Sequence, residues 1–232
     1  MDQLGQAAAL AIRLIVEGDA DLYAAVRTSL TVSVTATLVA FSIGAPLGAL
    51  LALRNFAARR PLLIAVNAAL GLPPVVIGLV VYLLLSHAGP FGGLNLLFTT
   101  RAMISAQILL TLPIVVALAH RATEASWRDY GDALRMDGTR TARSIAFLLT
   151  VEGGALVTTF LAAFGRAISE VGAIMIVGGN IRGHTRTLTT AVVLETSKGD
   201  LALALALGLI LVALTLLVSA SAFLLHERTA TR

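Results

Sequence analysis

Residues 201–225 read LALALALGLILVALTLLVSASAFLL, a run without a single charged side chain. An α-helix of about 20 such residues crosses the roughly 30 Å hydrocarbon core of a lipid bilayer. Four more apolar blocks of spanning length precede it, at residues 29–53, 61–86, 102–120 and 154–177. The sequence therefore predicts an all-α membrane protein with about five transmembrane helices, built as one transmembrane domain over residues 1–232.

The composition agrees with a chain whose main solvent is lipid. Hydrophobic residues make up 57% of the 232 residues and charged residues only 13%, whereas a soluble domain has about 25% charged residues. There is no Cys, and the four His residues are scattered, so neither a disulfide nor a metal site is predicted. A Gly-rich nucleotide-binding loop is also missing, because the one lysine, Lys198, is followed by Gly and Asp. We therefore expect no catalytic residue and no cofactor in this chain.

The N-terminal segment, residues 1–28, differs from the apolar blocks. Its apolar residues recur at helical spacing, at Leu4, Ala8, Ala11, Ile12 and Ile15. This pattern predicts a short amphipathic helix lying in the membrane interface. A frayed chain terminus is the alternative.

The basic residues indicate how the spans are oriented. Ten of the 17 basic residues follow the first, third and fifth blocks, Arg228 and Arg232 among them, and six lie on the opposite side. Cytoplasmic loops carry the excess of Lys and Arg. We therefore expect a multi-pass protein of the cell inner membrane, with its N-terminus outside and its C-terminus in the cytoplasm.

Two of the blocks carry helix breakers or polar groups at membrane depth. The second contains the adjacent prolines Pro73 and Pro74, which interrupt the backbone hydrogen bonds of a helix. The third contains Gln107. Broken helices often line transport pathways, so we assign these three residues to a candidate translocation pathway. Ordinary packing of a kinked helix is the alternative.

The fourth block is the most informative, because residues 165–173 read GRAISEVGA. Ionisable residues inside a span usually face the bundle interior or a water-filled cavity. Arg166 and Glu170 lie one helical turn apart and can form an ion pair. We therefore add Arg166, Ser169 and Glu170 to the candidate pathway. An ion pair that only stabilises the fold is the alternative.

The longest polar segment, residues 121–144, separates the third and fourth blocks, and we expect it to be a cytoplasmic coupling loop. Its centre, residues 132–138, reads DALRMDG. A short helix ending at Gly138 is predicted there, because Gly favours the left-handed position after a helix. A solvated connector is the alternative.

This segment resembles the EAA loop of ATP-binding-cassette (ABC) importer permeases. Asp132 stands at the Glu position, Ala133 and Leu134 at the two Ala positions, and Gly138 at the Gly. Two features depart from the family pattern. Leu134 replaces a small residue, and the Ile-x-Leu-Pro that usually follows is represented only by residues 148–151, LLTV.

Other stretches are similar to the oxyanion branch of this family, the molybdate, tungstate and sulfate permeases. They are LPPVV at 72–76 with Gly78, GPFG at 89–92, LFT at 97–99, AMI at 102–104 and AQ at 106–107. The most specific resemblance is to tungstate permeases. It begins with GRAISEVGAIMIVGGN at 165–180 and continues to residue 200.

The resemblance implies the transmembrane domain of a type I ABC importer for tungstate, with molybdate or sulfate as alternative cargo. It implies a second permease copy, a dimer of ATPase subunits that bind ATP and magnesium, and an extracytoplasmic binding protein. The binding protein would face the outer loop, residues 180–200, with Arg182, Arg186 and Lys198. Asp132, Ala133, Leu134 and Gly138 would couple the permease to the ATPase. A self-sufficient channel or secondary transporter, an intramembrane enzyme and a structural subunit without a pathway are the competing hypotheses.

Overall fold

The computed structural model describes residues 2–230, which fold into helices and connecting segments without a strand. Met1 and Arg232, the ends of the predicted domain, lie outside the described residues, and so does the side chain of Arg228. Three helices are long and apolar enough to cross a membrane: α2 (Ala20–Leu53), α5 (Thr100–Met136) and α10 (Leu201–Ala230). Two bent helix pairs raise the number of spans to five if each pair is one span. The prediction of an all-α, multi-pass membrane protein is confirmed.

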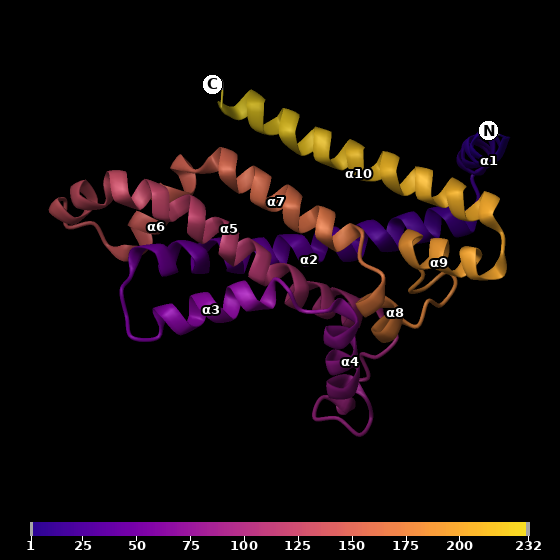
Figure 1. Cartoon of the computed structure of the whole chain (residues 1–232), viewed down its shortest axis with the longest axis horizontal. Coiled ribbons are helices and arrows are strands. Elements are labelled where there is room, and N and C mark those ends of the chain that lie inside the picture. Colours follow the sequence, from indigo (N-terminus) through magenta and orange to yellow (C-terminus); the bar gives the residue numbers. More distant parts are fainter. Residues whose placement is uncertain (1, 231–232) are drawn as a thin grey trace.

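The centre of the fold is the contact between α2 and α5, which lie side by side (Figure 1). Gly44 and Gly48 are four residues apart on α2, and both face α5. A Cβ atom added to Gly48 would lie 2.6 Å from the carbonyl oxygen of Val116. Glycine at these positions lets the two helix backbones approach closely, as small residues do in membrane helix packing.

The second apolar block is broken where the sequence places Pro73 and Pro74. Helix α3 (Arg59–Ala69) ends before the prolines, and α4 (Pro74–Leu85) begins at the second one, bent by 105° from α3. Helix α3 runs back beside α5, whereas α4 projects away from the layer of long helices (Figure 1). A short turn, η1 (Gly92–Leu94), lies in the connection from α4 to α5.

The fourth block is also broken, although it contains no proline. Helix α7 (Gly153–Ile168) ends at Ser169, and the short α8 (Gly172–Gly178) follows. Upstream, α6 (Thr141–Val151) meets α7 at a bend of 81°.

Three predicted boundaries need correction. The amphipathic helix α1 (Asp2–Val16) packs on α10, but α2 already begins at Ala20, so residues 20–28 belong to the first long helix. The outer loop contains a helix, α9 (Leu188–Lys198), which begins with a capping box at Thr187 and Thr190. Residues 132–136 are the last turn of α5 rather than a separate short helix, because no proline follows Pro113 in this segment and the helix runs unbroken to Met136, with Gly138 just beyond its end.

Candidate functional site

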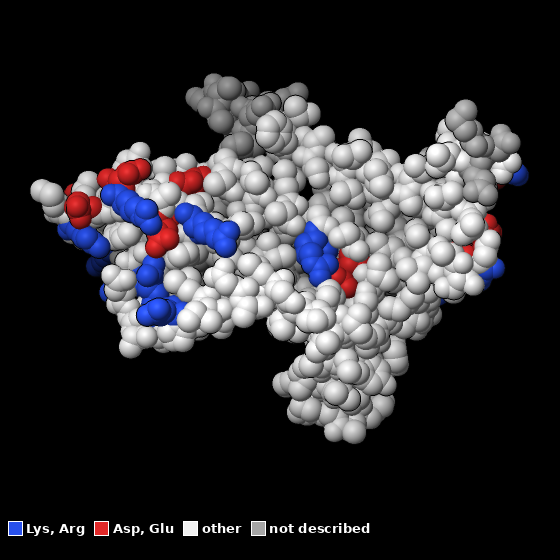
Figure 2. Space-filling model, in the orientation of Figure 1, with Lys and Arg blue, Asp and Glu red and all other residues white. Residues whose placement is uncertain are grey.

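The break between α7 and α8 contains the ion pair that the sequence indicated. Nη1 of Arg166 donates to Oε2 of Glu170 across 2.6 Å. The Glu170 side chain is 4% exposed and that of Arg166 is 35% exposed. In Figure 2 charged side chains gather toward the two ends of the molecule, and one basic and acidic patch lies between them on an otherwise uncharged surface. The structure therefore buries the acid and leaves part of the base accessible.

The Glu170 carboxylate also holds the start of α8. Its Oε1 accepts a hydrogen bond from the backbone N–H of Ala173 at 3.2 Å. The hydroxyl of Thr189, on α9, donates to the Glu170 carbonyl oxygen at 3.0 Å. Glu170 is thus neutralised by Arg166 and tied to two further helices, which satisfies a carboxylate that would otherwise be costly to bury.

Side chains add further hydrogen bonds to the backbone carbonyl groups in the last turn of α7. Gln107, on α5, donates through Nε2 to the Ala167 carbonyl at 2.8 Å, and the Ser169 hydroxyl donates to the Gly165 carbonyl at 2.7 Å. Gln107 is 1% exposed, and its Oε1 is the one buried side-chain atom among the described residues without a hydrogen-bond partner. Non-helical backbone at membrane depth needs such internal partners.

The break in the second span meets the break in the fourth. A Cβ on Gly78 would lie 2.6 Å from the Cα of Ala173, and one on Gly172 would lie 2.6 Å from Cγ2 of Val75. Val75 directly follows Pro73 and Pro74. All six predicted pathway residues therefore lie around the place where these two breaks meet.

An apolar hollow of about 230 Å³ adjoins this place. It is open on one side and lies between the end of α7 and the middle of α10. Its lining residues are Gly165, Ile168, Ser169, Leu211, Val212, Thr215 and Leu216.

The predicted coupling residues lie at the far end of α5. Asp132 is 25 residues from Gln107, which corresponds to about 37 Å along a helix. The helix closes with Gly138 at φ +65°, where the Gly138 N–H donates to the Arg135 carbonyl and the Thr139 N–H to the Leu134 carbonyl. This is a Schellman motif, which requires the left-handed conformation that Gly adopts without strain. The Asp132 side chain is 91% exposed, although Arg135 lies 3.2 Å from it.

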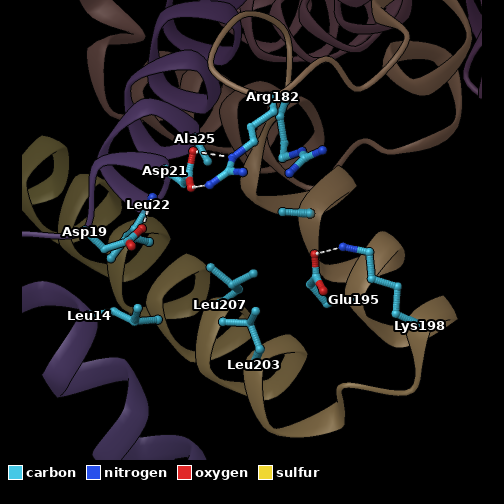
Figure 3. A pocket seen from close by; sticks show the side chains of 12 residues that line it. Leu14, Asp19, Asp21, Leu22, Ala25, Arg182, Glu195, Lys198, Leu203 and Leu207 are labelled. Atoms are coloured by element: carbon cyan, nitrogen blue, oxygen red, sulfur yellow. Dashed lines mark hydrogen bonds and ion pairs between the residues drawn. The ribbon is translucent and has the colours of Figure 1, made fainter.

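The predicted outer residues line a cleft of about 500 Å³ between the α1–α2 junction, α9 and α10 (Figure 3). Arg182 pairs with Asp21 at the start of α2, with Nε 2.8 Å from Oδ1. Lys198 pairs with Glu195 at 2.9 Å. The hydrogen bonds that Arg182 donates to the Asp21 carboxylate raise the pKa of Arg182. Arg186, half-buried, contacts Asn180 and has no carboxylate within ion-pair distance among the described residues.

The sequence analysis missed the acidic partners in this cleft. Glu195 is three residues from Lys198, and this helical spacing was a usable signal. Asp21 is 161 residues from Arg182, and no sequence pattern connects the two. Asp19 lines the same cleft and caps α2 through the Leu22 N–H.

Comparison with known proteins identifies relatives that match over most of the chain, although no protein-family model matches it. A "Probable anion ABC transporter permease protein" of Haloferax volcanii is 41% identical over 210 residues, covering 88% of this chain and 90% of the relative. The "Tungstate uptake system permease protein TupB" of Peptoclostridium acidaminophilum is 35% identical over 98% of this chain and 100% of its own length. The protein of the same name from Campylobacter jejuni is 34% identical over 83% of this chain and 80% of its own length.

Proposed function

The chain belongs to the permease subunits of anion ABC transporters, and from this membership we propose that it is the membrane subunit of a tungstate importer. The observation that supports tungstate as the substrate is the similarity to a tungstate uptake permease over 98% of this chain and 100% of that relative. The tungstate permease of Campylobacter jejuni supports the same substrate. Molybdate and sulfate remain the competing cargo, because all three are tetrahedral dianions.

The break between α7 and α8 is our candidate for the point where the anion crosses. A dianion needs cationic or N–H donors and no uncompensated carboxylate nearby. Arg166 holds Glu170 with one N–H group while about a third of its side chain stays accessible. Because a guanidinium has five N–H donors, Arg166 keeps donors for an anion. Ser169, three residues further along the chain, is exposed and adds a hydroxyl group beside it.

ATP hydrolysis and capture of the anion would be carried out by other subunits of the transporter. We propose a homodimer of this chain, two ATPase subunits that bind ATP and magnesium, and an extracytoplasmic binding protein. The end of α5, with Asp132, Ala133, Leu134 and Gly138, would contact the ATPase on the cytoplasmic side. The cleft with Arg182, Arg186 and Lys198 would face the binding protein outside. In this proposed arrangement the chain crosses the inner membrane with its N-terminus outside and its C-terminus in the cytoplasm.

The test is uptake by proteoliposomes that contain the permease and its ATPase, with the binding protein added outside and ATP enclosed on the ATPase side. We expect ATP-dependent accumulation of tungstate, measured by elemental mass spectrometry, and competition in the order tungstate, molybdate, sulfate. The permease alone should transport nothing. Anion flux through the permease without ATP would instead support the channel hypothesis, and preference for molybdate or sulfate would overturn the proposed cargo.

A further inference from the structure

Helix α4 is apolar on every side and lacks a cover on its outer face. Its sequence is PVVIGLVVYLLL, and within the described part of the chain only Gly78, Val81 and Leu85 are buried. The outward side chains are between one third and three fifths exposed: Val75, Val76, Leu79, Val80, Leu83 and Leu84. A helix that is apolar all round belongs in a protein or lipid interior.

The direction of α4 limits what can cover it. The helix is bent by 105° from α3, so it runs across the long helices and not along them (Figure 1). A helix lying flat in the membrane interface turns a polar face to water, and α4 has no such face. Its far end leads into residues 86–99, where His87 and Asn95 are exposed. Irregular backbone of this kind is not exposed to lipid tails, so a protein surface is the better cover.

The same chain offers a matching surface in the hollow between α7 and α10. The hollow is apolar apart from Ser169 and Thr215, and a Cβ added to Gly165 on its wall would meet nothing within 4 Å. Val212, also on its wall, is 56% exposed. Small residues in membrane helices usually let a neighbouring helix approach closely. No other helix of the same copy approaches Gly165 in this way, so this glycine leaves room for a helix of another copy.

Two-fold symmetry brings these two surfaces together. Val75 of α4 contacts Gly172, which is three residues from Ser169 on the wall of the hollow, so α4 and the hollow lie at the same depth. A two-fold axis along the membrane normal preserves depth. In Figure 1, α4 projects from one edge of the helical layer and α10 runs along the opposite edge. Rotation about such an axis, when it lies beside the face of the layer and not beside an edge, carries the partner's α4 to the α10 edge.

We propose that in the homodimer the outward face of α4 from each copy packs into the hollow between α7 and α10 of the other. The contact is isologous, because each copy contributes its own α4 and receives the α4 of its partner. Each break between α7 and α8 is then closed by a helix of the partner, and the site is incomplete in a single copy. This inference rests on the homodimer of the proposed function.

The chain contains no Cys, so disulfide cross-links between permease copies can form only at cysteines that are introduced. Two copies with different affinity tags are co-expressed with the ATPase, one carrying Leu79→Cys and the other Val212→Cys, and membranes are oxidised. We expect a disulfide-linked product that carries both tags. A matched control replaces Val212→Cys with Leu224→Cys, which lies 12 residues further along α10, about 18 Å away. Because a disulfide joins Cα atoms within about 7 Å, the control should lose the product.

A second variant tests the hollow itself. Gly165→Phe directs a bulky side chain toward the hollow, where a Cβ added to Gly165 meets nothing within 4 Å. It should abolish cross-linking between Leu79→Cys and Val212→Cys, while gel filtration shows a folded permease. Native mass spectrometry of the complex separates the two proposals. If two permease copies are found but do not cross-link, or cross-link equally to Leu224→Cys, the proposed packing of α4 on the partner copy is wrong while the homodimer stands. A single copy in an active complex would overturn the homodimer as well.

Discussion

Arg166 and Glu170 form a 2.6 Å ion pair in which the acid is 4% exposed and the base 35% exposed. Removing the base by Arg166→Met leaves a buried carboxylate without its counter-ion. Such losses cost about 3–5 kcal/mol in a fully buried pair, and partial exposure reduces the expected cost here to about 1–3 kcal/mol. We therefore expect a lower thermal unfolding temperature for Arg166→Met in detergent, together with loss of ATP-dependent uptake.

The double variant Arg166→Met/Glu170→Met separates a structural role from a transport role. It removes both charges, so we expect most of the lost thermal stability to return while uptake stays abolished. Normal uptake by a stable double variant would show that the pair only holds the fold. Glu170→Gln is a milder control, since its amide oxygen can still accept from the Ala173 N–H.

Gly138 should matter for coupling rather than for membrane insertion. Its φ of +65° closes the Schellman motif at the end of α5, and a residue with a side chain pays about 1–2 kcal/mol in this conformation. Gly138→Val should therefore distort the last turn of α5 and reduce co-purification with the ATPase and ATP-dependent uptake. Gly138→Asn should be tolerated better, because Asn enters the left-handed region more readily.

The matched control for Gly138 is Gly183, which has φ +72° and open space around it. Gly183→Val introduces the same kind of strain at the opposite end of the molecule. It should leave association with the ATPase unchanged. Equal loss of ATPase binding in both variants would mean that the effect comes from general destabilisation.

The sequence predicted most of the fold because the bilayer imposes a length on every span. Apolar blocks at residues 29–53 and 201–225 lie within α2 and α10, and the break at Pro73 and Pro74 has a local cause in the missing N–H groups. The end of α7 has no such local cause. It is held by Gln107 and Thr189, which come from other helices and donate to the Ala167 and Glu170 carbonyl groups.

The candidate site was predictable as a set of residues but not as an arrangement. A charged residue inside a span is costly, so Arg166 and Glu170 stood out from the sequence alone. The contact of α4 with α8 depends on Gly78 and Ala173, which are small residues with no distinctive pattern. The pairing of Arg182 with Asp21 joins opposite ends of the chain, and only the folded structure reveals it.

Gly48 should be the least replaceable glycine of the α2–α5 contact. An added Cβ would lie 2.6 Å from the Val116 carbonyl oxygen and 2.8 Å from the His120 nitrogen, both backbone atoms that cannot move aside alone. Gly48→Ala should therefore separate the helices and cost about 1–3 kcal/mol, as overpacking does. Thermal unfolding in detergent measures this. Gly5→Ala on α1 is the control, because nothing lies within 4 Å of the added Cβ, and its unfolding temperature should not fall.

Arg186 should contribute most to recruitment of the binding protein among the three basic residues of the outer cleft. Arg182 and Lys198 are already paired with Asp21 and Glu195, whereas Arg186 has no carboxylate within ion-pair distance among the described residues. Of the three positive charges, that of Arg186 is therefore the one not compensated by an ion pair within the described part of the chain, and it adds most to the long-range attraction of an acidic surface. We expect Arg186→Gln to slow association with the binding protein roughly threefold at low salt, and Arg182→Gln to have a smaller effect.

Surface plasmon resonance with the permease in lipid nanodiscs measures this difference. The gap between the two variants should close as salt rises, because the screening length falls to about 8 Å at physiological ionic strength. Equal slowing by both variants would indicate that internal pairing does not reduce the attraction of Arg182. No slowing by Arg186→Gln at low salt would mean that the binding protein contacts another part of the outer surface.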